Sequence, residues 1–284
     1  MVLGIAEVAD LWPESFVSYG LIKKKNPLLK IMYEYEKRMY MKADAIVFTM
    51  EGGKDYIIDK KWDIENGGSI DLKKIYYINN GIDFEEFECN KKKYIFSDVD
   101  LENKNIIKII YTGSIRKANA SIMILPEVAK KLRDRGIKNL KILVYGKGDY
   151  TEKLRHICEE KNINNLVVKG YVDKKYIPYI LSKGNINILN CNSSDVMRYG
   201  GSQNKLFEYL ASGHPIISGE ASKYSIINNN DCGISRHFNN ADEIVDEIIN
   251  LINNPIDSEH IRSIGKEYDF KILTNRLLDI MQSI

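Results

Sequence analysis

The chain has 284 residues, which is more than one ordinary α/β domain and fewer than two full-sized ones, at about 100 to 200 residues per domain. Its 41 basic and 39 acidic residues leave a net charge of +2, so no overall field favours a nucleic acid as a partner. With 44% hydrophobic and 28% charged residues, the composition is that of a folded globular protein and excludes extensive disorder.

The first hundred residues hold short apolar runs and amphipathic stretches. They predict strands at 5–9, 45–49 and 75–78 and helices at 28–42 and 56–62. A Rossmann-like domain has about five or six strands, so we expect residues 1–100 to form a partial domain of that type. The polar run at 90–105 lacks a core-forming period and is predicted to connect this part to the next. An open sheet edge needs a cover, so an upstream polypeptide or a second copy of the chain is expected there.

From about residue 106 the alternation of strands and helices becomes regular, which predicts a complete doubly wound domain over 101–265. The expected strands are 106–111, 141–145, 167–169, 186–189 and 215–218, all short and rich in Ile and Val. The expected helices are 121–135, 152–161, 176–183, 205–212 and 242–253. The closing segment, 266–284, contains an amphipathic helix at 272–281 that would pack back on the first part.

The most informative stretch, 200–217, joins a glycine-opened turn, a short helix and an apolar strand. The first N–H groups of a helix have no partner within it, and the helix dipole is positive there. The backbone amides of Ser202, Gln203 and Asn204 would therefore offer donors to an anion. One turn later, Glu208 would accept hydrogen bonds from paired sugar hydroxyls. The alternative is an ordinary surface helix with a solvated Glu208.

A second candidate phosphate turn follows the first strand of the second domain. Gly113 would let the backbone approach an anion closely, and Arg116 or Lys117 would then contact a diphosphate. A guanidinium fits phosphate oxygens better than an ammonium does, and ligands gather at this edge of a doubly wound sheet. The alternative is a loop whose two basic side chains face water.

Other kinds of site find little support in the sequence. The four cysteines form no Cys-x-x-Cys pair and share no metal-ligand spacing with a histidine, so no metal site is expected. The segment 146–148 lacks the third glycine of a dinucleotide fingerprint, which disfavours a dehydrogenase. No apolar run approaches the roughly 18 residues of a membrane span, and we expect a cytoplasmic protein.

Several motifs occur in the order found in one enzyme family. Lys-Leu-Phe-Glu-Tyr at 205–209, with Pro-Ile-Ile at 215–217, and Asp-Leu-Trp-Pro-Glu-Ser at 10–15 resemble motifs of retaining GT-B glycosyltransferases of family four. The second motif is similar to that of the bacterial branch that builds lipid-linked surface polysaccharides such as O-antigen or capsule. Asn-Asn-Gly-Ile-Asp at 79–83 resembles the Pro-Asn-Gly-Val-Asp turn of the family. In this chain Asn79 stands in place of the usual proline. The resemblance covers nearly the whole chain.

This resemblance implies an α/β fold of the GT-B type with two Rossmann-like domains, the first of them incomplete. It also implies transfer, with retention of configuration, of a hexosyl or N-acetylhexosaminyl group from a nucleotide-sugar, expected to be UDP-linked. The acceptor would be lipid-linked or a saccharide, and no cofactor or metal would be needed. The chain would be a peripheral protein on the inner face of the cell membrane.

The resemblance also implies roles for single residues. Glu208 corresponds to the ribose-binding carboxylate, and Tyr171 to the residue whose backbone meets the nucleobase, although a strand-end aromatic is an equal alternative. Many relatives carry a glutamate eight positions before Glu208, where this chain has Gly200, so the donor sugar stays open. The expected nucleotide-sugar-binding residues are Gly113, Arg116, Lys117, Tyr171, Ser202, Gln203, Asn204, Lys205 and Glu208.

The acceptor side is less specific. Asp10 would orient or deprotonate the acceptor hydroxyl, or it would cap a helix. Three lysines at 23–25 precede a basic helix, and such a pattern can hold a protein at an anionic leaflet. The alternative is a helix that covers the sheet and exposes a basic face to solvent. Two other function classes remain: a nucleotide-binding subunit or inactive fragment without catalysis, and a sugar-nucleotide epimerase.

Overall fold

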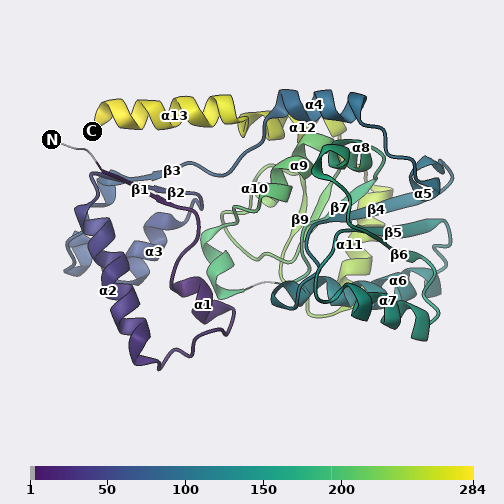
Figure 1. The fold of residues 1–284 in the computed structure, drawn as a ribbon, viewed down its shortest axis with the longest axis horizontal. Helices are drawn as coiled ribbons and strands as arrows, with labels where there is room; N and C mark the ends of the chain where they lie inside the picture. The colour runs from purple at the N-terminus through teal and green to yellow at the C-terminus, as the bar shows by residue number, and fades with distance from the viewer. Residues whose placement is uncertain (1–3, 193) are drawn as a thin grey trace.

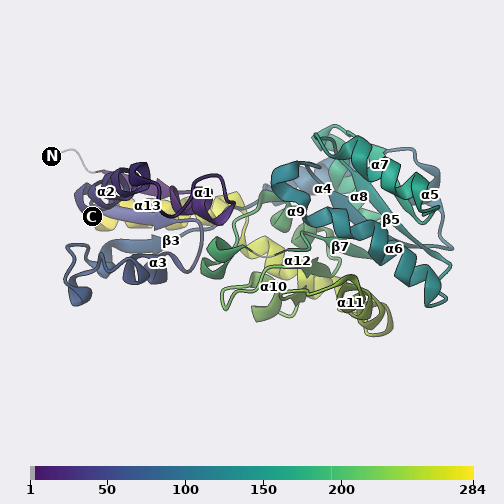
Figure 2. The same cartoon turned by 90° about the horizontal axis from the view of Figure 1, so that it is seen from below.

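The computed structural model describes residues 4–192 and 194–284, and over these residues it holds a three-stranded and a six-stranded sheet. The two sheets lie side by side along an elongated molecule, and the first described residues and the C-terminus lie at the end away from the larger sheet (Figures 1 and 2). Every strand pair is parallel. Parallel sheets are normally covered on both faces, and both sheets here follow that rule.

The smaller sheet has the order β1-β2-β3 and alternates its side chains between two cores. Its strands are β1 (Ile5–Val8), β2 (Ala45–Phe48) and β3 (Ile75–Tyr77). Ile46 and Phe48 face the core beneath the helices α2 (Pro27–Lys42) and α3 (Gly53–Asp59). The short helix α1 (Glu14–Ser18), which follows β1, has no buried residue. Ala45 and Val47 face Ile280 of α13 (Phe270–Ser283), which runs back along the opposite face (Figure 1).

The larger sheet has the order β6-β5-β4-β7-β8-β9, which is doubly wound with a switch point between β4 and β7. Its strands are β4 (Ile107–Thr112), β5 (Leu140–Tyr145), β6 (Leu166–Gly170), β7 (Ile186–Ile188), β8 (Ile216–Ser218) and β9 (Gly233–Ser235). In such a sheet ligands bind at the carboxyl ends of the strands beside the switch point.

Helices cover both faces of the larger sheet. One face carries α6 (Leu125–Asp134), α7 (Thr151–Glu160) and α11 (Ala241–Asn253). The other carries α4 (Phe84–Lys93), α8 (Ile177–Ser182), α9 (Asn204–Ser212), α10 (Ile226–Asn229) and α12 (Ser258–Glu267). Short 3₁₀ turns are η1 (Ile64–Asn66), η2 (Leu72–Lys74), η3 (Lys117–Ile124), η4 (Lys174–Tyr176) and η5 (Asp195–Tyr199).

The structure corrects the expected elements, and it adds the helices α1, α4, α10 and α12, which were not expected. The polar run at 90–105 was expected to be a connection but includes the end of α4 and the helix α5 (Val99–Glu102). Leu101 of α5 is 1% exposed and packs into the core of the larger sheet. The helix expected at 121–135 begins at Leu125, because Pro126 belongs in a first helical turn and the preceding residues form a 3₁₀ turn. Strand β9 was not expected.

The fold is mixed α/β with parallel sheets, as the sequence predicted. Within the described ranges, no helix is both long and apolar enough to cross a membrane.

Candidate functional site

A cavity of about 420 Å³ lies at the carboxyl edge of the larger sheet, beside the switch point between β4 and β7. Loops after β4, β5 and β6 form one side of it, and the first two turns of α9 form the other. The lining residues are Thr112, Gly113, Ser114, Arg116, Tyr145, Gly146, Lys147, Tyr171, Val172, Lys174, Ile177, Asn204, Lys205 and Glu208. Three loops of different origin therefore shape one pocket.

The loops after β4 and β5 are fixed to each other through their backbones. The Gly113 N–H donates to the Tyr145 carbonyl at 2.9 Å, and the Ile115 N–H donates to the Lys147 carbonyl at 3.1 Å. A Cβ at Gly146 would lie 1.7 Å from the Gly113 carbonyl oxygen, so only glycine permits this approach. Arg116 thus extends from a turn whose backbone is held in place.

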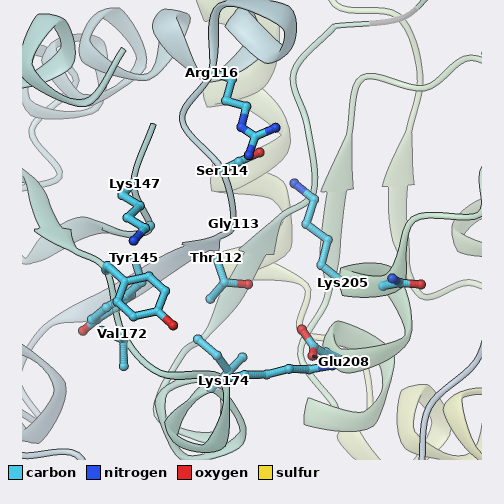
Figure 3. A pocket seen from close by; sticks show the side chains of 14 residues that line it. Thr112, Gly113, Ser114, Arg116, Tyr145, Lys147, Val172, Lys174, Lys205 and Glu208 are labelled. Atoms are coloured by element: carbon cyan, nitrogen blue, oxygen red, sulfur yellow. Dashed lines mark ion pairs between the residues drawn. The ribbon is translucent and has the colours of Figure 1, made fainter. Parts of the chain in front are cut away.

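Two cationic side chains point toward the space beside Gly113. Arg116 enters from the loop after β4 and Lys205 from the first turn of α9 (Figure 3). The Lys205 ammonium donates to the Leu189 carbonyl and lies 4.4 Å from the centroid of the Tyr111 ring. Burial lowers the pKa of Lys205 to about 8. A cation buried at such a cost is stabilised when an anion enters the cavity.

The N-terminus of α9 adds donors to the same cavity. No described side chain caps this helix, whose N-cap residue is Gln203 and whose first helical residue, Asn204, lines the pocket. The free N–H groups and the positive end of the helix dipole favour an anion there. The helix end and the two cations together make a site suited to a diphosphate.

Glu208 lies one turn further along α9, at the lower side of the pocket in Figure 3. Its side chain is 18% exposed, and burial raises its pKa. Lys174 places its Nζ 3.9 Å from Glu208 Oε1, but this lysine side chain is 87% exposed and solvent screens the pair. The carboxylate therefore keeps acceptor capacity for hydroxyl groups of a ligand.

The structure brings most of the predicted nucleotide-sugar residues together. Gly113, Arg116, Tyr171, Asn204, Lys205 and Glu208 line the cavity.

The other predicted residues lie outside its lining. Ser202 and Gln203 directly precede α9, and the Ser202 hydroxyl lies 3.5 Å from the Ala9 carbonyl. The Lys117 N–H donates to Asp149 at 3.0 Å and its side chain is exposed. Asp10 is also exposed, in the loop after β1. Their proposed roles stay predictions.

Sequence reasoning missed Lys147 and Lys174, which bring two more positive charges to the pocket. The Lys147 ammonium lies 4.4 Å from the centroid of the Tyr171 ring. The available signal was the position of both lysines in loops that follow predicted strands, where ligands of a doubly wound sheet gather.

A second cavity of about 350 Å³ lies between the smaller sheet and α13. Its lining is mainly apolar, with Ile5, Val47 and Leu277 among the residues, while Glu7 and Asn80 add polar groups. The described residues contain no cluster of three or more His, Cys, Asp or Glu side chains able to hold a metal ion, and the need for a metal stays untested.

Comparisons with known proteins give the family. The model for glycosyl transferases group 1 matches residues 107–254, just over half of the chain. No curated protein matches its sequence.

Among solved structures, Alr3699/HepE of Anabaena, in complex with UDP and glucose, is similar with a TM-score of 0.68 at 12% identity, covering 99% of this chain and 71% of that one. A glycosyltransferase of Rickettsia africae is similar with a TM-score of 0.66 at 14% identity, covering 99% and 76%. A mutant of S. aureus TarM, in complex with fondaparinux, α-GlcNAc-glycerol and UDP, has a TM-score of 0.59 at 17% identity, covering 91% and 48%. At these identities the structures show a shared fold. The chain belongs to the glycosyl transferases group 1 family and has its GT-B architecture.

Proposed function

We propose that the chain binds a UDP-linked sugar in the pocket beside α9 and transfers the sugar, with retention, to a lipid-linked or saccharide acceptor. One observation carries this proposal. Arg116, Lys205 and the uncapped N-terminus of α9 converge on a single cavity, and Glu208 adds a buried carboxylate one turn away. A diphosphate next to a ribose is the ligand that uses all of these groups.

The parts of the donor then have defined partners. The diphosphate lies between Arg116, Lys205 and the first turn of α9, which neutralise the leaving group without a metal. Glu208 accepts from the ribose hydroxyls, and the base lies beside Tyr171. Support for a UDP donor comes from Alr3699/HepE, a protein of the same fold with structures in complex with UDP and with UDP-glucose. The motif at 205–209 supports membership of family four and a hexosyl or N-acetylhexosaminyl donor.

An amphipathic acceptor fits the smaller part of the molecule. The cavity between the smaller sheet and α13 offers apolar side chains near Glu7 and Asn80. On α2, exposed apolar residues at helical spacing, Leu28, Ile31 and Tyr35, lie among lysines. These features support a lipid-linked acceptor reached from the anionic inner face of the cell membrane, in surface polysaccharide synthesis. They would equally suit a surface helix with a basic face.

One observation favours a second candidate, a nucleotide-binding chain that transfers sugar poorly by itself: β1 pairs only with β2 among the described strands. An upstream polypeptide or a second copy of the chain would then cover the open edge of β1 and complete the acceptor side.

Calorimetry with UDP and transfer assays with a panel of UDP-sugars distinguish the candidates. For the enzyme we expect UDP binding and sugar transfer to a lipid-linked acceptor, with UDP released in step with product. Glu208→Gln serves as the donor-site control and should weaken UDP binding about tenfold and lower transfer as well. UDP binding without transfer would favour the non-catalytic candidate, and no binding of UDP would overturn the proposed site.

A further inference from the structure

The loop before α9 is tied to the smaller sheet through its own carbonyl groups. The Tyr199 carbonyl accepts from the Gly52 N–H at 2.8 Å, and the Gly201 carbonyl accepts from Asn79 Nδ2 at 3.1 Å. The Ser202 carbonyl accepts from Asn80 Nδ2. Gly52 follows β2, and the two asparagines follow β3. The segment that leads into the diphosphate site is therefore fixed from the other sheet.

Asn79 is held so that it can make this contact. It is 5% exposed, its Nδ2 also donates to the Tyr77 hydroxyl at 2.9 Å, and its Oδ1 accepts from the Asn80 N–H at 2.8 Å. Both ends of the amide are used, so its donor faces the Gly201 carbonyl in one orientation. A proline at this position would have no side-chain donor to offer.

Glu220 holds the same peptide segment from the larger sheet. Its side chain is 5% exposed and its carboxylate lies against Gly201. Burial raises the pKa of this carboxyl to about 7, while the Gly201 backbone acts to lower it. A Cβ at Gly201 would lie 2.5 Å from Glu220 Oε2, so any larger residue here would displace the Glu220 carboxylate. The Glu220 backbone is itself anchored, since its carbonyl accepts from the Ser235 hydroxyl at 2.7 Å.

We infer that Asn79 and Glu220 are positioning residues that contact Gly201 from the two parts of the molecule. They thereby fix the loop that precedes α9, whose N-terminus binds the donor diphosphate. This inference rests on the proposed donor site. The Gly201 carbonyl accepts from Asn79 after β3, and the Glu220 carboxylate after β8 lies against the same residue. The loop therefore takes its present shape only while the two parts of the molecule stay together. Donor binding is thus coupled to contact between the two sheets, with Asn79 as the side chain that transmits it.

Asn79→Asp changes the shape of the side chain very little, and an ionised carboxylate has no donor for the Gly201 carbonyl. We expect UDP affinity to fall about fivefold or more and uridine affinity to change less than about twofold, since the loop serves the diphosphate. Asn79→Ala and Glu220→Ala should act in the same direction, and Glu220→Gln, which keeps an acceptor, should retain most of the affinity. Asn26→Asp, which alters the cap of α2, is the matched control with wild-type binding.

Hydrogen exchange without ligand separates this inference from the proposed function. Asn79→Ala should speed exchange over residues 200–206 and leave β8 unchanged. If the wild type fails to bind UDP but Asn79→Ala speeds exchange over residues 200–206, the proposed donor site is wrong. The positioning of Gly201 by Asn79 is then still supported. The inference is overturned if Asn79→Ala and Glu220→Ala bind UDP as the wild type does, or if uridine and UDP lose affinity equally. An additive double variant would also contradict it, because both residues act on one peptide segment.

Discussion

The buried ammonium of Lys205 makes the donor-site proposal quantitative. Burial lowers its pKa from the ordinary 10.5 to about 8, so at pH 8 about half of these side chains are neutral. A diphosphate in contact with Nζ favours the charged form, and UDP binding should return the side chain to full protonation. Binding is therefore expected to take up about half a proton per UDP at pH 8 and about a tenth near pH 7.

Lys205→Met keeps the length of the side chain and removes its charge. Losing one charge-assisted contact of about 1.5 to 3 kcal/mol should lower UDP affinity about tenfold to hundredfold. Calorimetry at pH 8 in two buffers of different ionisation enthalpy measures proton uptake, and the difference between wild type and variant isolates Lys205. This comparison removes any contribution from Glu208, whose pKa burial raises.

The stability of the free protein gives a second measurement with a defined sign. The folded pKa of Lys205 lies below its unfolded value, so the unfolded chain holds more protons between about pH 8 and 10.5. The wild type should therefore gain stability as pH rises through this window, and Lys205→Met should lack that gain while being at least as stable below pH 8. Equal UDP affinity, or equal proton uptake in the two proteins, would place Nζ away from the diphosphate and refute the reasoning.

Three further predictions concern the same pocket. Glu208→Gln keeps the side-chain volume but removes a charged acceptor, and should weaken UDP binding about tenfold with little change in melting temperature; unchanged affinity by calorimetry would contradict a ribose contact. Arg116→Ala should weaken UDP binding much more than uridine binding, with Lys117→Ala as control; a phosphate-selective loss in the Lys117 variant alone would exchange their roles. Gly146→Ala would place a Cβ 1.7 Å from the Gly113 carbonyl oxygen, so we expect a lower melting temperature and loss of UDP binding. Normal binding by that variant would mean that the turn does not shape the site.

The sequence predicted the larger sheet well because its central strands are buried on both faces. Strands β4 and β5 consist mainly of Ile, Leu, Val and Tyr, each with one Lys at its second position, and such mostly apolar strands are typical of a parallel sheet. Strand β9 has only the residues Gly, Ile and Ser, too few to show a period. Helix α5 was not predicted because it has only four residues, too few to show a helical period, and only the tertiary structure shows that Leu101 packs into the core.

The site residues were predictable where a single segment of the chain determines their relative positions. A glycine turn followed by a helix places Asn204, Lys205 and Glu208 on neighbouring turns, whatever the rest of the fold does. The choice between Arg116 and Lys117 could not be made in this way. It depends on Asp149, which accepts from the Lys117 N–H across two loops, and on the path of the chain that this contact fixes.

The charged groups of the pocket differ in kind from those that hold the fold together. Burial acts to raise the pKa of Asp100, but hydrogen bonds from Lys141 and Lys169 hold it below its ordinary value, so that charge is stabilised within the protein. In the pocket the direction is opposite: burial lowers the pKa of Lys205 and raises that of Glu208, and each charged form is disfavoured in the free protein. Side chains in such unfavourable environments are typical of binding sites, where a ligand stabilises their charged forms. An anion beside Lys205 and hydroxyl donors beside Glu208 would relieve both at once, which is the combination that a ribose diphosphate supplies.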